Sequence, residues 1–471
     1  MVLQMVLPET RSNSSPRGGG LRRRRLLAGA GALGGVAVLA ACGPTPGGGA
    51  GDAAKTQGPV TIKLSMWDYR PDIVRDNVDR FERENPGIKV EGPETGPCCE
   101  DYRKRMNTNF LAGERLDAMY MRDEDAAEWA EAKWVLALDR FPGARDLTKD
   151  EYPFVTEQTN YKGKKYGTIY YVGPQIAMYN KEHVGQAGFS KPPASWDELR
   201  QQANQIKRQR INGVEFPIWG APGGGHLENF YLASGKRMFD DDLQPVFGKD
   251  ALFKDMVDKL YQAYTGDKIF GVDPTVQAAF DNGKSSFTWT SFYDLKRLNG
   301  QATGAVAGAQ MGGAAAGQLL NYVNTGFVAG KTGTQAICRQ YAVAASSRYP
   351  DQAYKLIYFL GGKDAAGKYS VAKRWWLEQG LNFGYKSLFD DPEVKKSVEG
   401  WGDLEAYNKV VVNASPRPGI KAPWSALWRV ESNKVFDDVF AGKMTSKDGI
   451  ERSVQIWNQM RADFEKNNPK Q

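Results

Sequence analysis

Histidine and cysteine are scarce in this chain of 471 residues. It contains two histidines, His183 and His226, which stand far apart in the sequence, and four cysteines. A zinc site built from several histidines is therefore excluded, and a Ser-His-Asp triad would have to use one of these two. The G-x-S-x-G and H-E-x-x-H motifs of esterases and zinc proteases are also absent. We expect no catalytic residue, no metal site and no cofactor.

Excess positive charge is confined to the amino terminus. The formal net charge is +7, yet residues 1–41 hold six arginines against one acidic residue, Glu9. The remaining residues carry 56 basic and 54 acidic side chains, which is close to balance. Since no large field on the rest of the chain would attract a polyanion, we expect no nucleic-acid partner.

Long apolar runs are absent as well. After Arg22–Arg25, residues 26–41 form a weakly apolar stretch of sixteen residues that is rich in Ala and Gly. This is shorter than the roughly 20 residues that span a bilayer as a helix. Basic residues followed by such a stretch are typical of an export signal. The pair Arg23-Arg24 resembles the core of a twin-arginine signal, with general secretion as the alternative.

The end of this stretch, Leu39-Ala40-Ala41-Cys42, resembles a bacterial lipobox, in which the cysteine is acylated and becomes the first mature residue. Acyl chains on Cys42 would anchor the protein by burial worth about 0.8 kcal/mol per methylene. Residues 43–58 have no large apolar side chain and predict a flexible tether. We therefore expect an export signal over 1–41, a lipidated tether over 42–58, and a location outside the cytoplasmic membrane, in the periplasm or on the cell surface.

Three further cysteines, Cys98, Cys99 and Cys338, leave the disulfide pattern open. In an oxidising compartment, one of the adjacent pair could bridge to Cys338, or the two could bridge to each other. An odd count leaves one thiol over. A zinc site is not indicated, because it needs paired C-x-x-C spacing.

The rest of the chain alternates between strand and helix patterns. Residues 60–67 alternate apolar and polar side chains, and residues 72–84 carry apolar side chains at helical spacing before a second strand begins at Ile88. Such β-α-β units predict an α/β fold with a largely parallel sheet covered by helices. Further strands are predicted over 116–121 and 285–290, and further helices over 100–112, 124–133, 196–207, 249–264, 275–282, 350–360 and, as a pair, 434–467.

Several sequence segments carry a resemblance to a known family. They are the opening strand ending in Trp67, FERENPGIKVE (81–91), LDAMYM with Asp123 after it, EWAEAKWVLALD (128–139), YKGKKYGTIYYVGPQIAMYNKEHVGQAGFSKPPASWDEL (161–199), FDNGKSSFTW (280–289) and YAVAASSRYPDQAYKLIYFL (341–360). Their order and spacing resemble the bacterial extracellular solute-binding proteins of family 1, the sugar-binding lipoproteins of ABC transporters that include maltose-binding proteins. The chain departs from that pattern at the Cys98-Cys99 loop and at Thr303–Gln318, a Gly- and Ala-rich run that we interpret as a long mobile loop.

The resemblance implies a periplasmic-binding-protein type II fold, in which two α/β lobes joined by hinge strands surround a ligand cleft. Lobe 1 would comprise residues 59–172 and about 337–385, and lobe 2 residues 173–336 and about 386–471. The lobes would close on the ligand, and the transporter would recognise the closed state. The implied partners are a carbohydrate, the transmembrane permease subunits with their cytoplasmic ATPase, and the lipid bilayer through acylated Cys42. We expect a monomer.

Candidate ligand-binding residues follow from the chemistry of sugars. Carbohydrates present apolar C–H faces and many hydroxyls, so their sites combine flat aromatic rings with planar donors and acceptors. Several aromatic residues stand where predicted strands end, which is where open α/β sheets bind ligands. For Asp123 the alternative is a helix cap, and for Arg374 a solvated surface arginine. With the family positions, this predicts ligand contacts from Trp67, Tyr69, Asp123, Tyr171, Trp289, Arg374, Trp375 and Trp376.

Other functions stay open at this point. Glu228 and Asn229, with His226, either reach the cleft or belong to a surface loop. If the protein serves an importer, the alternative ligands are a glycerol phosphate diester, a polyamine or an iron chelate. A phosphate site would need converging arginines or helix N-termini, and a polyamine site would need several acidic residues around aromatic rings. A surface glycosidase or polysaccharide lyase is the enzyme alternative, since a carboxylate pair needs no special motif.

Overall fold

The computed structural model describes residues 59–214, 216–219, 224–271, 284–290, 293, 296, 320–323, 333–399 and 404–468. The predicted export signal, the tether, the helix over 275–282 and the loop Thr303–Gln318 lie outside these residues. In the part of the chain that is described, no helix is both long and apolar enough to cross a membrane.

The first sheet contains the β-α-β pattern predicted at the start of the folded chain. β1 pairs in parallel with β2 on one side and with β3 on the other, whereas β12 is antiparallel to β3 and to β6. The strand order is β13-β12-β3-β1-β2, and β6 also pairs with β12. The strands are β1 (Val60–Ser65), β2 (Ile88–Glu94), β3 (Ala118–Arg122), β6 (Thr168–Pro174), β12 (Thr334–Val343) and β13 (Ala414–Ser415).

The second sheet begins directly after β6. β6 ends at Pro174 and the next strand starts at Ile176, so the chain passes from the first sheet to the second at Gln175. The strand order is β11-β7-β10-β8-β9. These strands are β7 (Ile176–Asn180), β8 (Ile218–Trp219), β9 (Phe270–Gly271), β10 (Phe287–Thr290) and β11 (Leu320–Val323).

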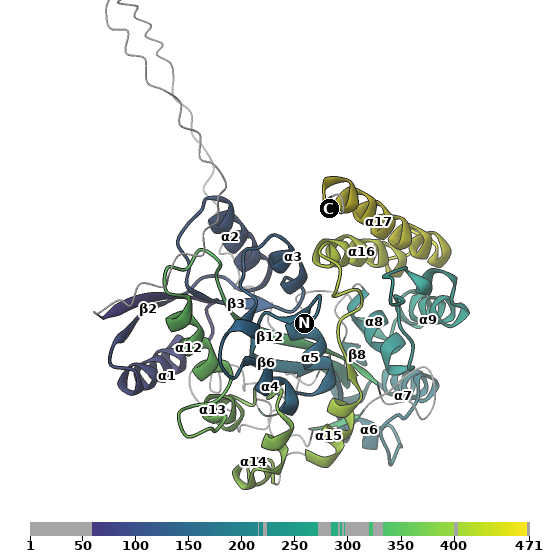
Figure 1. The fold of residues 1–471 in the computed structure, drawn as a ribbon. Helices are drawn as coiled ribbons and strands as arrows, with labels where there is room; N and C mark the ends of the chain where they lie inside the picture. The colour runs from purple at the N-terminus through teal and green to yellow at the C-terminus, as the bar shows by residue number, and fades with distance from the viewer. Residues whose placement is uncertain are drawn as a thin grey trace, which may run out of the picture. The chain divides into compact units, whose positions relative to one another are not determined.

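Helices pack on both sheets through apolar faces. In α1, Ile73, Val74, Val78 and Phe81 are buried at helical spacing, and Figure 1 shows α1 and α12 beside the first sheet and α16 next to α17. The main helices are α1 (Pro71–Glu84), α2 (Cys99–Leu111), α3 (Ala126–Glu131), α4 (Ala144–Asp150), α5 (Pro153–Thr159), α6 (Lys181–Gln186), α7 (Trp196–Gln209), α8 (Gly224–Ala233), α9 (Ala251–Tyr261), α12 (Pro350–Gly361), α13 (Ser370–Gln379), α14 (Pro392–Lys396), α15 (Leu404–Val412), α16 (Ser425–Phe440) and α17 (Ser446–Asn467).

The prediction of the tail helices was wrong at its start. The sequence predicts helix only from Lys434, whereas α16 begins at Ser425. The reason is Trp428, which extends the apolar face of α16 and packs edge-on against Trp457 of α17, with ring centroids 5.3 Å apart. Burial of two tryptophans stabilises a helix start that its local sequence marks only weakly.

Three buried clusters form the interior. One surrounds the first sheet, and the second surrounds the second sheet and includes Trp196 and Trp457. The third lies on β6 and β12 and is covered by residues from α5 and from α13 to α15. β12 therefore has both faces buried: all ten of its residues are buried, although three of its side chains, those of Gln335, Arg339 and Gln340, are strongly polar.

Candidate functional site

Aromatic side chains gather beyond the carboxyl end of β1. The ring of Trp67 lies 4.5 Å from that of Tyr120 and 5.3 Å from that of Tyr102, centroid to centroid. Trp375 of α13 approaches the same group, 5.4 Å from Tyr170 and 6.1 Å from Tyr69. We call this group the aromatic cluster; its members are Trp67, Tyr69, Tyr102, Tyr120, Tyr170, Tyr171, Tyr293, Tyr341 and Trp375.

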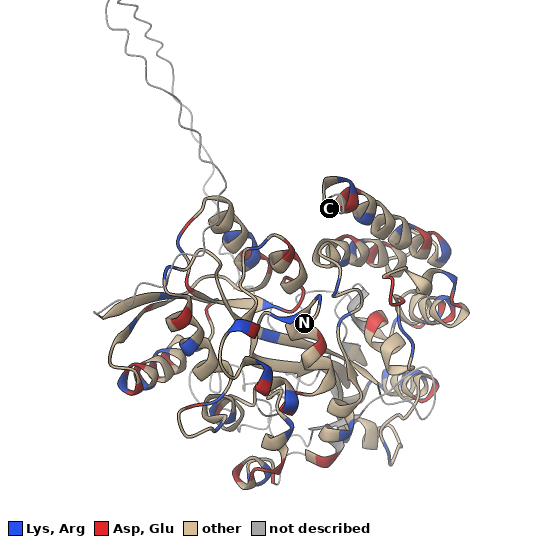
Figure 2. Ribbon diagram, in the orientation of Figure 1, with Lys and Arg blue, Asp and Glu red and all other residues tan. Residues whose placement is uncertain are grey.

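Charged side chains gather beyond the end of β3. Asp123 Oδ1 accepts a hydrogen bond of 2.5 Å from Nη1 of Arg339. Arg417, between β13 and α16, pairs with Glu124, and its Nε lies 3.9 Å from Oδ2 of Asp123. We call Arg122, Asp123, Glu124, Asp125, Arg339 and Arg417 the ionic cluster. Figure 2 shows basic and acidic positions close together at the centre of the view, around β3, β6 and β12.

Strand register brings the two clusters together. On β12, Arg339 stands opposite Arg122 of β3 on one side and opposite Tyr171 of β6 on the other. Tyr171 also contacts Tyr170, at 4.8 Å between ring centroids. Burial raises the pKa of Tyr171, although Arg339 opposes that shift. Its phenol therefore stays protonated at neutral pH and lies where the aromatic cluster meets the ionic cluster.

The arginines of the ionic cluster are held by neighbouring carboxylates. Burial alone would lower the pKa of Arg122, but Asp125, whose Oδ2 lies 2.6 Å from Nε of Arg122, raises it above the ordinary value. Burial lowers the pKa of Arg417 to about 9, and Asp123 only partly offsets that effect. Both arginines are charged at neutral pH, and Arg417 is the one whose charge is least stabilised.

Buried polar atoms of the ionic cluster are left without hydrogen bonds. Among the described residues, Oδ2 of Asp123, Oε2 of Glu124 and Nε of Arg417 have no hydrogen-bond partner, although Oε2 of Glu124 is in an ion pair with Arg417. Such a group costs roughly 1–3 kcal/mol when it stays unpaired. A ligand hydroxyl, which both donates and accepts, could pair with the carboxylate oxygen and the guanidinium N–H at once.

Asp123 is not a helix cap. The residue before α3 is Asp125, and its side chain makes no capping hydrogen bond. Instead Asp123 is completely buried and faces Arg339.

Glu228 and Asn229 are buried in α8 and do not belong to a surface loop. Oδ1 of Asn229 accepts hydrogen bonds from the backbone N–H of Gln335 at 2.8 Å and from the hydroxyl of Thr334 at 2.9 Å. Glu228 pairs with Arg429 of α16; burial raises the pKa of this carboxyl and Arg429 opposes the shift. Asn229 therefore ties α8 to the start of β12, and Glu228 ties it to α16. The side chain of His226 is outside the described residues.

Three of the predicted ligand contacts lie away from both clusters. Trp289 packs in the second core, with its ring 5.0 Å from that of Phe230. Trp376 belongs to the third core, and its Nε1 donates to the hydroxyl of Ser397 at 2.9 Å.

The third, Arg374, joins α13 to α1. Its Nη1 lies 2.5 Å from Asp76, and its Nε lies 2.7 Å from Glu378. The structure thus brings together Trp67, Tyr69, Asp123, Tyr171 and Trp375.

Sequence reasoning missed several members of the two clusters. Arg339 could have been predicted as a site residue, because it lies within an apolar strand sequence and a charged residue on a fully buried strand needs a partner. Arg417 follows a serine and a proline in an irregular segment and gives no comparable signal. In the sequence, nothing distinguishes Tyr102 and Tyr120 from residues of a hydrophobic core.

Of the two disulfide arrangements left open, the structure forms the bridge between neighbours. Cys98 and Cys99 are joined, and Cys338 is a buried free thiol on β12.

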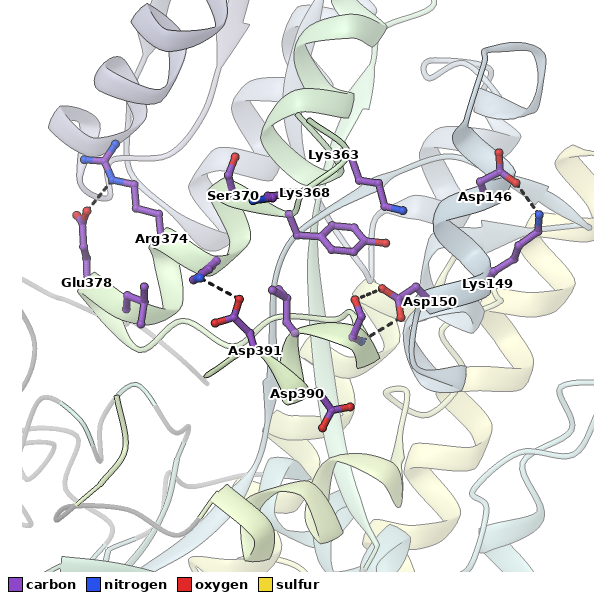
Figure 3. A pocket seen from close by; sticks show the side chains of 16 residues that line it. Asp146, Lys149, Asp150, Lys363, Lys368, Ser370, Arg374, Glu378, Asp390 and Asp391 are labelled. Carbon is purple, nitrogen blue, oxygen red and sulfur yellow. Dashed lines mark hydrogen bonds and ion pairs between the residues drawn. The ribbon is translucent and has the colours of Figure 1, made fainter. Parts of the chain in front are cut away.

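A surface groove of about 1030 Å³ lies between α4, α13 and the turn Lys386–Asp390 (Figure 3). Several of its charged side chains pair with one another: Lys149 with Asp146 at 2.7 Å, and Lys373 with Asp391 at 2.8 Å. Among the described residues that line it, only Tyr369 is aromatic, so the groove is a weaker candidate for a sugar than the two clusters. Over the described residues, no group of three or more His, Cys, Asp and Glu side chains is placed to hold a metal ion.

Comparison with known proteins identifies the family. Residues 67–367 match the family model of the bacterial extracellular solute-binding proteins. A binding protein of Brucella abortus (strain 2308) is 21% identical over 374 residues, covering 77% of this chain and 83% of the relative.

Solved structures of similar proteins share the fold. Maltose-bound MalE3 of T. maritima superposes with a TM-score of 0.69 at 16% identity, covering 85% of this chain and 99% of that one. The sugar-binding protein MalE from Xanthomonas citri gives 0.69 at 18% identity, with 86% and 99% covered. A solute-binding protein from Agrobacterium vitis S4 with bound D-mannitol gives 0.63 at 19% identity, with 87% and 100% covered. The chain has the type II periplasmic-binding-protein fold and belongs to the bacterial extracellular solute-binding proteins.

Proposed function

We propose that this protein captures a sugar or oligosaccharide between two lobes and delivers it to the permease of an ABC importer, held to the membrane by a lipid on Cys42. The observation that supports the sugar most directly is the contact between the aromatic cluster and the ionic cluster. Aromatic faces bind the C–H faces of a sugar, and planar charged groups bind its hydroxyls.

The charge balance of the ionic cluster favours a neutral ligand. Three arginines face three carboxylates, and each arginine lies against at least one of them. A phosphate diester would need arginines without carboxylate partners, and a polyamine would need carboxylates without arginine partners. A neutral polyol exchanges hydrogen bonds with such a cluster without burying net charge. The maltose and D-mannitol in the structures with the same fold are neutral as well.

Contacts between the proposed lobes support closure around the ligand. With lobe 1 as residues 59–172 and about 337–385, Arg417 belongs to lobe 2 and its partner Glu124 to lobe 1. Tyr293 of lobe 2 likewise contacts Tyr69 of lobe 1, at 6.3 Å between ring centroids. A ligand bound among these residues would touch both lobes, and it would therefore stabilise the arrangement in which they meet.

The anchor and the route of export rest on the sequence. The lipobox-like Leu39–Cys42 and the tether over 43–58 place the two lobes within reach of a permease at the membrane surface. Export by the twin-arginine pathway is proposed on Arg23-Arg24, with general secretion as the alternative.

A thermal-shift screen of the chain from residue 43 onward tests the ligand class. The panel contains maltose, maltotetraose, D-mannitol, glycerol phosphates and polyamines. A ligand at a hundred times its dissociation constant stabilises the fold by about 2.7 kcal/mol, which raises the unfolding midpoint measurably. We expect a saccharide to raise the midpoint without product formation. A response only to glycerol phosphates or polyamines would contradict the proposal that the ligand is a sugar. Cleavage of maltotetraose would contradict the proposal that the protein binds its ligand without catalysis.

A further inference from the structure

The disulfide Cys98–Cys99 stands at the start of α2, next to the proposed ligand site. Cys98 packs against the first core, and the loop before it is tied to the aromatic cluster because the carbonyl of Gly96 accepts a hydrogen bond of 2.8 Å from the N–H of Asp68, between Trp67 and Tyr69. Both cysteines are half-buried, so a small reductant can reach them.

The backbone of Cys99 has a φ of +65°. This left-handed conformation is rarely kept by residues other than glycine, because the Cβ atom crowds the backbone. A bond between the sulfurs of adjacent residues closes a small ring around one peptide bond, which limits the conformations open to Cys99. Breaking the bond would let Cys99 return to negative φ, and the first turn of α2 would change with it.

The first turn of α2 contacts both clusters. Oε2 of Glu100 lies 3.0 Å from Nη2 of Arg122 in the ionic cluster. Three residues further on and on the same face, Nε of Arg103 lies 3.2 Å from Oδ1 of Asp125. A shift of this turn would therefore weaken the contact that holds Arg122, the residue before Asp123.

The same turn carries Tyr102 into the aromatic cluster. Its hydroxyl donates to the carbonyl of Tyr120 at 2.9 Å, and its ring contacts Trp67 edge-on at 5.3 Å. Glu100, Tyr102 and Arg103 thus connect the disulfide to both halves of the site within one helical turn.

We propose that the Cys98–Cys99 disulfide is a redox-controlled positioning element: oxidised, it holds the first turn of α2 against Trp67 and Arg122, and reduced, it releases that turn and weakens ligand binding. The affinity part of this inference rests on the proposed function. In the reductive step, a dithiol supplies two electrons and two protons, the S–S bond breaks, two thiols form, and the dithiol becomes a disulfide.

Hydrogen exchange without any ligand tests the structural part. The chain from residue 43 onward is compared before and after treatment with dithiothreitol, with the disulfide verified by mass spectrometry. We expect exchange to be about tenfold faster after reduction in peptides covering 99–106 and 120–128, and unchanged in α17. A change confined to residues 94–101 would overturn the proposal, because the turn would then not transmit the effect to β3.

Affinity tests the functional part. Titrations with maltose, maltotetraose and D-mannitol, followed by tryptophan fluorescence, should give a dissociation constant about tenfold higher for the reduced protein. The double variant Cys98→Ser/Cys99→Ser should bind as weakly as the reduced protein and ignore dithiothreitol, whereas Cys338→Ala should keep the response.

Equal affinities in the oxidised and reduced proteins would overturn the proposal. If the double variant does not fold, the dissociation constants of the oxidised and the reduced natural chain still test the proposal. If none of the three saccharides binds either form, the proposed sugar class fails, while hydrogen exchange still decides whether the disulfide positions the site.

Discussion

Arg339 donates a hydrogen bond of 2.5 Å to Asp123, which precedes it by 216 positions in the sequence. The antiparallel register of β12 on β3 makes this contact, because it places Arg339 directly opposite Arg122. The pair fixes one oxygen of the Asp123 carboxylate and leaves the other beside Arg417. This carboxylate, held on one side only, is the polar centre of the proposed ligand site.

Removing Arg417 should destabilise the protein strongly. Glu124 would lose one close ion-pair partner and keep Arg122, 3.1 Å away; a lost hydrogen bond to a charged group costs about 1.5–3 kcal/mol. We therefore expect Arg417→Gln to lower the free energy of unfolding by this amount, as measured by urea denaturation.

The double variant Arg417→Gln/Glu124→Gln is the matched control. Because it removes both charges, it should be more stable than Arg417→Gln alone, with a coupling of about 1–3 kcal/mol. If the losses of the two single variants simply add, the ion pair does not hold these segments together.

Trp375 and Trp376 are neighbours on α13 with different surroundings, so they form a natural comparison. Trp375 belongs to the aromatic cluster and Trp376 to the third core. Trp375→Phe should weaken binding of the saccharide found in the screen by about fivefold, corresponding to about 1 kcal/mol of lost aromatic contact.

Trp376→Phe should lower stability by about 1–3 kcal/mol, since it leaves space in a packed core, and should leave the dissociation constant unchanged. Calorimetric titration of both variants distinguishes the two roles. Equal losses of affinity would contradict the separation of the two residues between site and core.

Lys296 makes stability depend on pH in the alkaline range. Its ammonium donates to the carbonyl of Trp376 at 3.1 Å, and burial lowers its pKa to about 8. Unfolded, the same group titrates near 10.4. Between these values the unfolded chain binds more protons, so this residue makes the free energy of unfolding rise with pH.

The measurement compares the natural chain with Lys296→Met from pH 7 to 10.5. Relative to the variant, the natural chain should gain on the order of 3 kcal/mol of stability across this window. Parallel curves for the two proteins would show that Lys296 does not titrate in this range.

The Tyr171 hydroxyl should matter more for binding than for folding. It lies at the boundary of the two clusters beside Arg339, which Asp123 still pairs when the hydroxyl is removed. We expect Tyr171→Phe to weaken saccharide binding by up to about tenfold and to change the free energy of unfolding by about 1 kcal/mol. Tyr264→Phe, in the second core, serves as the control that leaves affinity unchanged.

Local patterns in the sequence predicted most of the regular elements. The stripe Ile73, Val74, Val78 and Phe81 predicted α1, and Ser195, whose hydroxyl accepts from the N–H of Glu198 at 3.3 Å, predicted the start of α7. These signals lie within one element, so a single sequence carries them.

The contacts between distant elements could not be predicted in the same way. Arg339 meets Asp123 only through the register of β12, and Arg417 reaches the site from an irregular segment near the end of the chain. Periodicity also did not distinguish Trp375 from Trp376. The sequence did not show that Ser370–Gln379 is a helix, and only a helix assigns the two side chains to different faces. Residues on separate elements meet through tertiary packing, which local spacing does not encode.

The most direct test of the account is calorimetric titration of the oxidised chain, from residue 43 onward, with maltose, maltotetraose and D-mannitol, together with Trp67→Ala. The account predicts that the natural chain binds at least one of them at one site per molecule, with no product formed, and that Trp67→Ala binds it at least tenfold more weakly. The absence of binding of all three ligands, or saccharide binding of equal strength in Trp67→Ala, would contradict it.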